Sequence, residues 1–398
     1  DTKPATTDWD YDPYTVTLNT GTEYANNTDQ SKISKMVLVH THEGETHQYI
    51  GAGKLDGGVN KIDFVTLPTN LSEGTRTAAL YTEEGLLAYN MDIAVSDNNF
   101  TVLDMGKYGM KKVTEGDSTY FEVSTSLQLG QLISDKNKTE GERYLLVDDL
   151  DMEHTTYAIK PASFPAGSIL DGNGHDIIHL EIEGNGVFTE NYGTLRNVRI
   201  ASGLIKGTDS SNPMGAICQV NHGVIEAVVN QAYIQPAEGH EIVGGIAGEN
   251  GENGTILATV NTGDVLGGTT VGGIVGNNKN STAGAIKASI NIGLLNKGAT
   301  TLGGIIGTSV DGTNNGGIVN TCAWLTGTAR LDQSISNELA VGNDPEGGTD
   351  DMSADLAASR IRSTEAIGIL NDASDPWVFR LMENLSSWPI AIRKPTHP

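Results

Sequence analysis

A pattern of about thirty residues returns along the chain between Gly215 and Ile318. Each copy reads approximately Gly-Gly-Ile-x-Gly-x-Asn, then Gly-x-Ile-x-Ala, then Asn-x-Gly-x-Val, and its clearest openings are GGIAGEN, GGIVGNN and GGIIGTS. The isoleucines of the second element are 31, 30 and 32 residues apart, at Ile225, Ile256, Ile286 and Ile318. A fixed period of this size indicates supersecondary units that bury their apolar sides only against their neighbours. The repeat therefore predicts a solenoid.

Each repeat consists of short apolar runs that suit strands rather than helices. Three runs rich in Ile, Val and Thr are separated by Gly and Asn, and none shows a helical period. They predict an all-β, right-handed parallel β-helix with three strands and about 30 residues per coil, in which the coils stack about 4.8 Å apart. The equivalent isoleucines would form an internal ladder. Asn230, Asn261 and Asn291 would form a corner stack that bonds the backbone of the next coil.

The segments on either side of the repeats carry a family resemblance. LLVDDLDMEHTTYAI (145–159) and ILDGNGHDIIHLEIEGNGVFTENYGTLRNVRI (169–200) precede them, and TCAWLTGT (321–328) and SSWPIAI (386–392) follow. From about Ser118 to the C-terminus the chain resembles the GLUG-repeat, adhesin-like surface proteins of Bacteroidetes. This resemblance implies a β-helix displayed at the cell surface, and it implies no catalytic residue.

The N-terminal part of the chain lacks the repeat. Seven alternating apolar patterns, spaced for an all-β domain, predict strands at 14–20, 35–42, 46–53, 61–67, 75–82, 86–95 and 100–105. They favour a β-sandwich, which resembles the fimbrillin-like or immunoglobulin-like modules of Bacteroidetes surface proteins. We therefore expect a tether at 1–13, a sandwich at 14–117, a capped β-helix at 118–328 and a C-terminal capping segment at 329–398.

Both ends of the predicted solenoid have candidate caps, which a solenoid needs to cover its open end coils. Helical spacing predicts a short helix at Ser126–Lys136, capped by Ser124, Thr125 or Ser126. A second helical segment at Ser353–Asp372 is expected to break near Ser363. Three aromatic residues, Trp377, Phe379 and Trp388, are expected to complete the C-terminal seal.

The acidic composition limits the partners. The formal net charge of −25 argues against nucleic acid and anionic membrane surfaces as partners. No apolar run is long enough to span a membrane. Because the chain starts at Asp1 rather than Met, we expect an exported protein, with membrane attachment only through an N-terminal lipid anchor. Cys218 and Cys322 would lie on the order of 14 Å apart, too far for a disulfide.

Two acidic groups are the candidate metal ligands. Asp149, Asp151 and Glu153 share one face of a strand, and Asp171 and Asn173 lie in a DGNGHD turn. The turn lacks the Gly and Glu of a calcium-binding EF-hand loop. The pattern favours turns and solvated charges, and leaves a metal site as the alternative.

The same two interpretations apply to two further groups of polar residues. His40, His42 and His47, with Glu43 or Glu45, are either the polar face of an edge hairpin or metal ligands. The acidic segment 343–351 is either a loop or a metal site.

The sequence contains none of the common hydrolase, nucleotide-binding or metalloprotease motifs, and we assign no catalytic residue and no cofactor. It predicts an exported, non-enzymatic surface protein for adhesion or recognition of a glycan or protein partner. One alternative is a carbohydrate-active enzyme on the β-helix. For that alternative, the candidate aromatic residues are Tyr233 and Trp324. Fragments that resemble pectin hydrolases, but stand in the wrong order, lie at 148–149, 261–264 and 360–362. The other alternative is a fimbria-associated subunit whose sandwich accepts or donates a strand.

Overall fold

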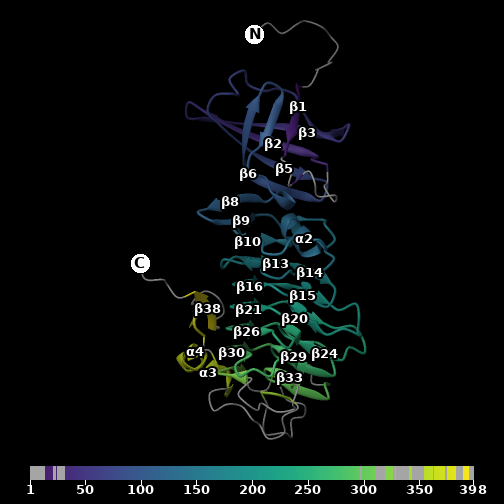
Figure 1. Ribbon diagram of the computed structural model, residues 1–398, viewed down its shortest axis with the longest axis vertical. Helices are drawn as coiled ribbons and strands as arrows, with labels where there is room; N and C mark the ends of the chain where they lie inside the picture. Colours follow the sequence, from purple (N-terminus) through teal and green to yellow (C-terminus); the bar gives the residue numbers. More distant parts are fainter. Residues whose placement is uncertain are drawn as a thin grey trace. The chain divides into compact units, whose positions relative to one another are not determined.

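The computed structural model describes residues 14–20, 24, 32–295, 298–309, 319–325, 328, 340–342, 354–361, 363–372, 374–381 and 389–393. The chain divides into two compact units, Asp1–Leu129 with His154–Tyr157 and Gly130–Glu153 with Ala158–Pro398 (Figure 1). The predicted tether at 1–13 and the acidic segment at 343–351 lie outside the described residues.

The first unit contains seven strands in one sheet that closes on itself, in the order β1-β4-β3-β2-β5-β6-β7. The strands are β1 (Tyr14–Asn19), β2 (Lys35–His42), β3 (Glu45–Asp56), β4 (Val59–Phe64), β5 (Thr75–Thr82), β6 (Gly85–Ser96) and β7 (Asn99–Val102). All seven predicted strands are confirmed. The two faces of the expected sandwich belong to one continuous sheet, because β1 pairs antiparallel with β4 and parallel with β7.

A hairpin and a helix follow the barrel. They comprise the 3₁₀ turn η1 (Lys107–Gly109), β8 (Lys111–Glu115), β9 (Ser118–Val123) and α2 (Ser126–Ser134). Residues between the barrel and α2 therefore form a short antiparallel hairpin of β8 and β9. Helix α2 confirms the predicted helix, and the Thr125 hydroxyl accepts a hydrogen bond from the Gln128 amide as its cap (3.2 Å). The last turn of α2 attaches to the first coil, since the Ala162 amide donates to the Ile133 carbonyl (3.1 Å).

The second unit is a parallel β-helix of about six turns with roughly 29 residues per turn, as predicted. We number its stacked sheets I to V. Sheet I contains β10 (Arg143–Leu146), β12 (Ile169–Asp171), β16 (Thr194–Arg196), β21 (Val224–Glu226), β26 (Thr255–Leu257), β30 (Ile286–Lys287) and β34 (Val319–Asn320). Sheet II contains β11 (Leu150–Asp151), β13 (Asp176–Ile178), β17 (Arg199–Ile200), β22 (Val229–Asn230), β27 (Val260–Asn261), β31 (Ile290–Asn291), β35 (Ala323–Leu325) and β36 (Ala354–Leu356). The 3₁₀ turn η2 (Met152–His154) follows β11.

The remaining sheets complete each coil. Sheet III contains β14 (Leu180–Glu183), β18 (Gly203–Lys206) and β23 (Tyr233–Gln235). Sheet IV contains β19 (Met214–Gly215), β24 (Ile242–Gly244), β28 (Thr270–Gly272) and β32 (Thr301–Gly303). Sheet V contains β15 (Phe188–Asn191), β20 (Cys218–Asn221), β25 (Ala247–Asn250), β29 (Val275–Asn278) and β33 (Ile306–Ser309).

The predicted three strands per coil are wrong, because complete coils contain four or five short strands. The Gly-Gly-Ile run, interpreted as one strand, turns a corner: β24 ends at Gly244 and β25 begins at Ala247. A Cβ atom on Gly245 would lie 2.0 Å from the Gly273 carbonyl oxygen of the next coil. The corner therefore requires glycine because the backbones of two coils approach closely there.

The predicted internal ladder is present, with one correction of register. Ile225 pairs with Ile256 and Ile256 with Ile286, and all three are buried. The next member is Val319 rather than Ile318, which lies outside the described residues. The last repeat is therefore one residue longer than its sequence pattern indicates.

Two asparagine ladders run through the solenoid. In the predicted one, the side-chain amides of Asn230, Asn261 and Asn291 are joined by N–H···O bonds of 2.9 Å. Each amide also donates to the carbonyl two residues further along its own coil, and not to the backbone of the next coil as expected. A second ladder, which the sequence analysis did not identify, connects Asn191, Asn221, Asn250 and Asn278 at 2.8–2.9 Å.

The described C-terminal segment packs along the flank of sheet II. It contains α3 (Ala358–Ile361), α4 (Thr364–Asn371), β37 (Trp377–Leu381) and β38 (Pro389–Arg393), and the predicted break falls at Ser363, which caps α4. Trp377 and Phe379 belong to the same buried cluster as Val229 and Val260. Among the described C-terminal residues, β36 alone extends sheet II at its end. The segment therefore covers a side of the solenoid, while Trp388 lies outside the described residues.

The flank beneath this segment explains a row of unusual alanines. Ala227, Ala258 and Ala288 occupy equivalent corners between sheets I and II with φ of 51°, 56° and 49°. The left-handed conformation costs an L-residue roughly 1–2 kcal/mol. A small apolar side chain is nevertheless suited to these corners, because all three alanines belong to the cluster buried under the C-terminal segment. Cys218 and Cys322 are both buried as reduced thiols.

Candidate metal centre on an open charged face

The outer face of sheet II changes character along the solenoid. One row of outward positions runs from coil to coil through strands that pair in register. Its members, in order, are Asp176, Arg199, Val229, Val260 and Ile290. The three apolar members are covered by the C-terminal segment. The charged members on the preceding coils lie outside that cluster. We call this stretch of the first three coils the open charged face.

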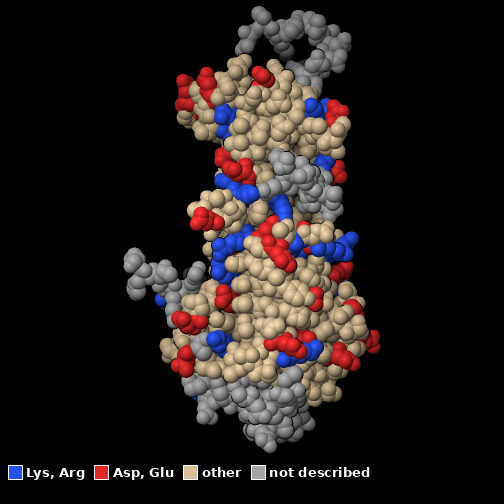
Figure 2. All heavy atoms as spheres, viewed as in Figure 1, with Lys and Arg blue, Asp and Glu red and all other residues tan. Residues whose placement is uncertain are grey.

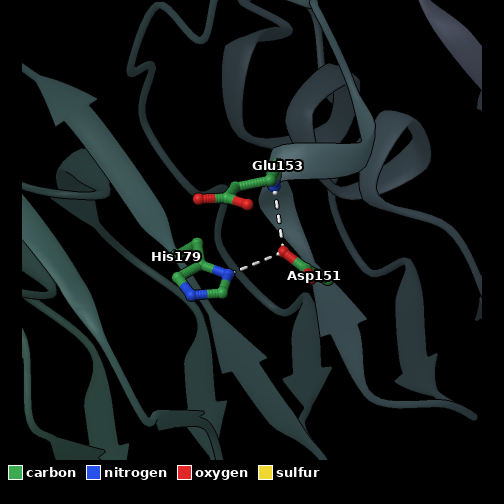
Figure 3. A group of neighbouring side chains, drawn as sticks. All are labelled: Asp151, Glu153 and His179. Carbon is green, nitrogen blue, oxygen red and sulfur yellow. Dashed lines mark hydrogen bonds and ion pairs between the residues drawn. The ribbon is translucent and has the colours of Figure 1, made fainter.

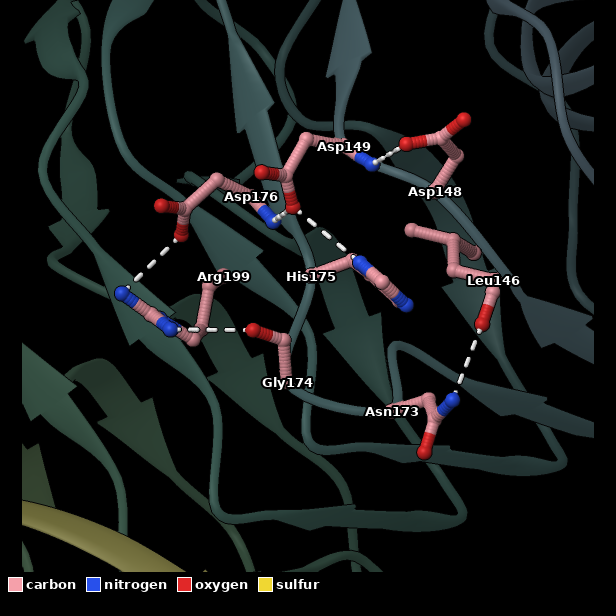
Figure 4. A network of polar contacts seen from close by, with 8 residues as sticks. All are labelled: Leu146, Asp148, Asp149, Asn173, Gly174, His175, Asp176 and Arg199. Carbon is pink, nitrogen blue, oxygen red and sulfur yellow. Dashed lines mark hydrogen bonds and ion pairs between the residues drawn. The ribbon is translucent and has the colours of Figure 1, made fainter.

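Asp149 organises one end of the open charged face. Its carboxylate accepts hydrogen bonds from the Asp176 amide (2.9 Å) and from His175 Nδ1 (3.1 Å), so it holds the turn of the next coil (Figure 4). The bond from the Asp176 amide is the main reason why the pKa of Asp149 is lowered. Arg199 continues the network, with an ion pair to Asp176 (3.0 Å) and a bond to the Gly174 carbonyl (2.9 Å).

Asp171 and Asn173, two of the predicted metal candidates, form the turn itself. The Asp171 carboxylate accepts a bond from the Asn173 amide (2.9 Å) and pairs with Arg196 (2.7 Å). The Asn173 side chain donates to the Leu146 carbonyl of the previous coil (3.3 Å). Ion pairs of this kind recur between neighbouring coils, as between Glu249 and Lys279 (2.8 Å). Figure 2 shows acidic and basic side chains interspersed on one face of the molecule.

Asp151 and Glu153, the other two candidates, meet a residue that the sequence analysis did not select, His179. Each of these three residues offers one possible metal-ligand atom, and the three atoms all lie within 4.8 Å of one another (Figure 3). His179 Nδ1 is 2.9 Å from the Asp151 carboxylate, and the His179 amide donates to the Ser202 hydroxyl (2.9 Å). Because Asp151 pairs with Ile178 across the coils, stacking places His179 beside it. Only the register between coils could have identified this residue.

The chemistry of this group favours a transition metal over calcium. Two carboxylates and one imidazole form a three-ligand set that suits Zn²⁺ and leaves a further position for water or a partner group. Calcium prefers oxygen ligands alone. The pKa of His179 is raised, first by its hydrogen bond to Asp151 and then by the charges of Glu153 and Asp151. A proton and a metal ion therefore compete for this imidazole.

We expect Zn²⁺ to bind the purified chain at this group, and His179→Gln to weaken that binding at least about tenfold. The matched control is His175→Gln, which removes a neighbouring imidazole outside the three-ligand set and should change zinc affinity less than about twofold. Because the folded-state pKa of His179 lies above its ordinary 6.5, affinity should rise as pH increases through that pKa. Calorimetric titration at several pH values measures both effects. Equal losses in the two variants, or no binding, would exclude this centre.

The histidines of the first unit are held by local partners. Strand β2 lies between β3 and β5, so the hairpin is not at an edge as expected. His40 is only 3% exposed, with Nε2 2.8 Å from the Glu73 carbonyl. His42 lies 3.2 Å from the Glu73 carboxylate, and His47 lies 3.4 Å from Glu45. These contacts account for the histidine positions without a metal.

The residues noted for a carbohydrate-active enzyme lie in separate structural contacts. Asn261 belongs to the buried ladder, Asp264 accepts a bond from the Leu294 amide (2.8 Å), and Arg360 pairs with Glu365. Of the two candidate aromatic residues, Trp324 is buried at 3% exposure, whereas Tyr233 is 54% exposed. Tyr233 is therefore the one of these two that can contact a ligand.

Comparison with known proteins finds a distant likeness among solved structures. A scan against protein-family models finds no match, and neither does a search of the curated proteins. Among solved structures, the chain is similar to a Bacteroides ovatus protein provisionally named an immunoglobulin A1 protease, at 17% identity and a TM-score of 0.45. The match covers 69% of this chain and 93% of that chain, and it carries no argument about activity. The resemblance to GLUG repeats remains a prediction. Among the described residues, no helix is long and apolar enough to cross a membrane.

Proposed function

We propose that this chain is an exported, non-enzymatic surface protein that recognises a glycan or protein partner through the open charged face. The observation that carries the proposal is the change along sheet II. From Val229 to Ala323 its outer side is apolar and covered, whereas on the first three coils it carries charged side chains on the same straight scaffold. A rigid, regular surface that the described residues do not cover is suited to contact with a partner.

The charges of this face indicate the chemistry of the partner. Its acidic side chains exceed its cations, with Asp149, Asp151, Glu153 and Asp176 against Arg199. Such a surface attracts basic groups directly, and it attracts hydroxyl or carboxylate groups through a bound metal ion. Asp149, Asp176 and Arg199 are already held by hydrogen bonds and ion pairs. This arrangement favours a preorganised contact surface over an acid–base pair that must exchange protons.

The test is a binding screen of the full chain on immobilised glycans and extracellular-matrix proteins, with and without Zn²⁺. For each ligand bound, we expect the double variant Asp149→Asn/Glu153→Gln to weaken binding by about tenfold or more. The control, Glu45→Gln/Glu115→Gln, removes two exposed carboxylates from the first unit and should leave affinity within about twofold. Unchanged binding in the first variant would contradict the proposed face. Depolymerisation of any polysaccharide in the screen would favour the carbohydrate-active enzyme instead.

A further inference from the structure

The outer face of sheet III has a different chemistry and lies on another side of each coil. We propose that it is a docking surface for a basic, amphipathic segment of a protein partner. The proposal is independent of the open charged face. Its core consists of the apolar residues Leu204, Tyr233 and Leu294, which share one row with Asp264, and of Leu266 in the adjacent row.

The register between coils places these side chains together. Leu204 pairs with Tyr233 in the strands β18 and β23. The next coils continue the row, because Ile234 bridges to Val265 and the Val265 amide donates to the Leu294 carbonyl (2.8 Å). Asp264 and Leu294 therefore follow Tyr233 at successive coils. The alternate positions, which include Ile205, Ile234 and Val265, face the core and are buried.

The outward side chains form an apolar patch in solvent. Tyr233, Leu266 and Leu294 are 54%, 56% and 54% exposed. Isolated exposed apolar residues are ordinary, but members of adjacent rows on consecutive coils lie within about 5–8 Å of one another. The comparable apolar row on sheet II is covered by the C-terminal segment, whereas these three side chains are not. The patch therefore has the composition of an interface core without its partner.

The charges around the patch determine which partner fits. Exposed carboxylates surround it, with Glu181 and Glu183 on β14 and Glu238 and Glu241 in the loop after β23. Among the described residues of this face, Lys206 is the only cation. A second copy of the chain, nucleic acid and an anionic membrane would all bring negative charge, and are disfavoured. Tyr233 is the single aromatic ring among these four side chains, and the leucines provide no further flat ring against which a sugar could stack. A protein segment with basic and apolar side chains satisfies both features.

The probe is a synthetic Leu/Lys amphipathic peptide, with its Leu/Glu counterpart as the reversed-charge control. Fluorescence anisotropy of the labelled peptide measures its binding to the full chain. The measurement is made at about 0.15 M salt, because salt screens long-range attraction between charges. We expect the Leu/Lys peptide to bind and Tyr233→Ser/Leu266→Ser to weaken it at least about tenfold. The matched control is Tyr89→Ser/Leu103→Ser, which changes exposed residues of the same types in the first unit and should have less than about a twofold effect.

Three outcomes would overturn the proposal: no binding, equal binding of the two peptides, or equal effects of the two double variants. The last would mean that the peptide responds only to the net negative charge of the chain. Thermal unfolding of both variants checks that the fold is retained. The Asp149→Asn/Glu153→Gln variant should bind the Leu/Lys peptide like the parent chain. This result separates the failure of one surface from the failure of the other.

Discussion

Gly273→Ala is expected to destabilise the solenoid by more than about 4 kcal/mol, or to prevent its folding. A Cβ atom at this position would lie 2.1 Å from the Gly304 carbonyl oxygen of the next coil and 2.6 Å from the Cβ of Asn291. The carbonyl belongs to a backbone that is itself paired, so it cannot move away without separating two coils. Overpacking against backbone is among the most costly of single substitutions. Chemical denaturation followed by circular dichroism measures the loss.

The same chemical change at Gly368 provides the control for this prediction. Gly368 is exposed within helix α4, and a Cβ atom there would have nothing within 4 Å. Because alanine is a better helix former than glycine, Gly368→Ala should stabilise the chain by about 0.5–1 kcal/mol. If Gly273→Ala unfolded at the same denaturant concentration as the parent chain, the close approach of the coils at this corner would be wrong.

Asn261→Ala is expected to cost about 3 kcal/mol of unfolding free energy. Asn261 is fully buried at the centre of its ladder, where it accepts from Asn230 and donates to Asn291 and to the Gly263 carbonyl. Removal of the amide takes one hydrogen-bond partner from a buried side-chain amide on each neighbouring coil, those of Asn230 and Asn291. Each such group costs about 1–3 kcal/mol, which exceeds the net value of the bonds themselves.

Urea denaturation of the full chain measures this cost, with Asn253→Ala as the comparison. Asn253 is an exposed loop residue of the same repeat, and its substitution should change the free energy of unfolding by less than about 0.5 kcal/mol. A loss below about 1 kcal/mol for Asn261→Ala would show that the ladder is not a continuous network.

Some features of the fold could be predicted from the sequence pattern, and others could not. The strands of the first unit were predictable because alternation of apolar residues is local and each strand carries its own signal. The closure of the barrel was not, since nothing within Tyr14–Asn19 indicates that β1 pairs with both β4 and β7. The division of the Gly-Gly-Ile run into two strands also depends on a contact between coils, at Gly245 and Gly273.

The candidate metal centre also combines residues that the sequence could identify with one that it could not. Asp151 and Glu153 are close in sequence and could be selected by their charge and spacing. His179 lies in the next coil, and stacking of the coils makes it a neighbour of Asp151. The covered flank of sheet II is a further example, because the repeated Val and Ile before each ladder asparagine face outward and become buried only when the C-terminal segment packs on them.

The sequence by itself determined the repeat, its period, the all-β fold of both units and the inward-facing ladder of isoleucines, because these depend on periodic burial within a short stretch of chain. The tertiary structure alone decided which side of the solenoid is covered, which residues meet across coils and which apolar side chains remain in solvent. These features depend on contacts between residues far apart in sequence, and neither composition nor spacing along the chain encodes the distance between such residues.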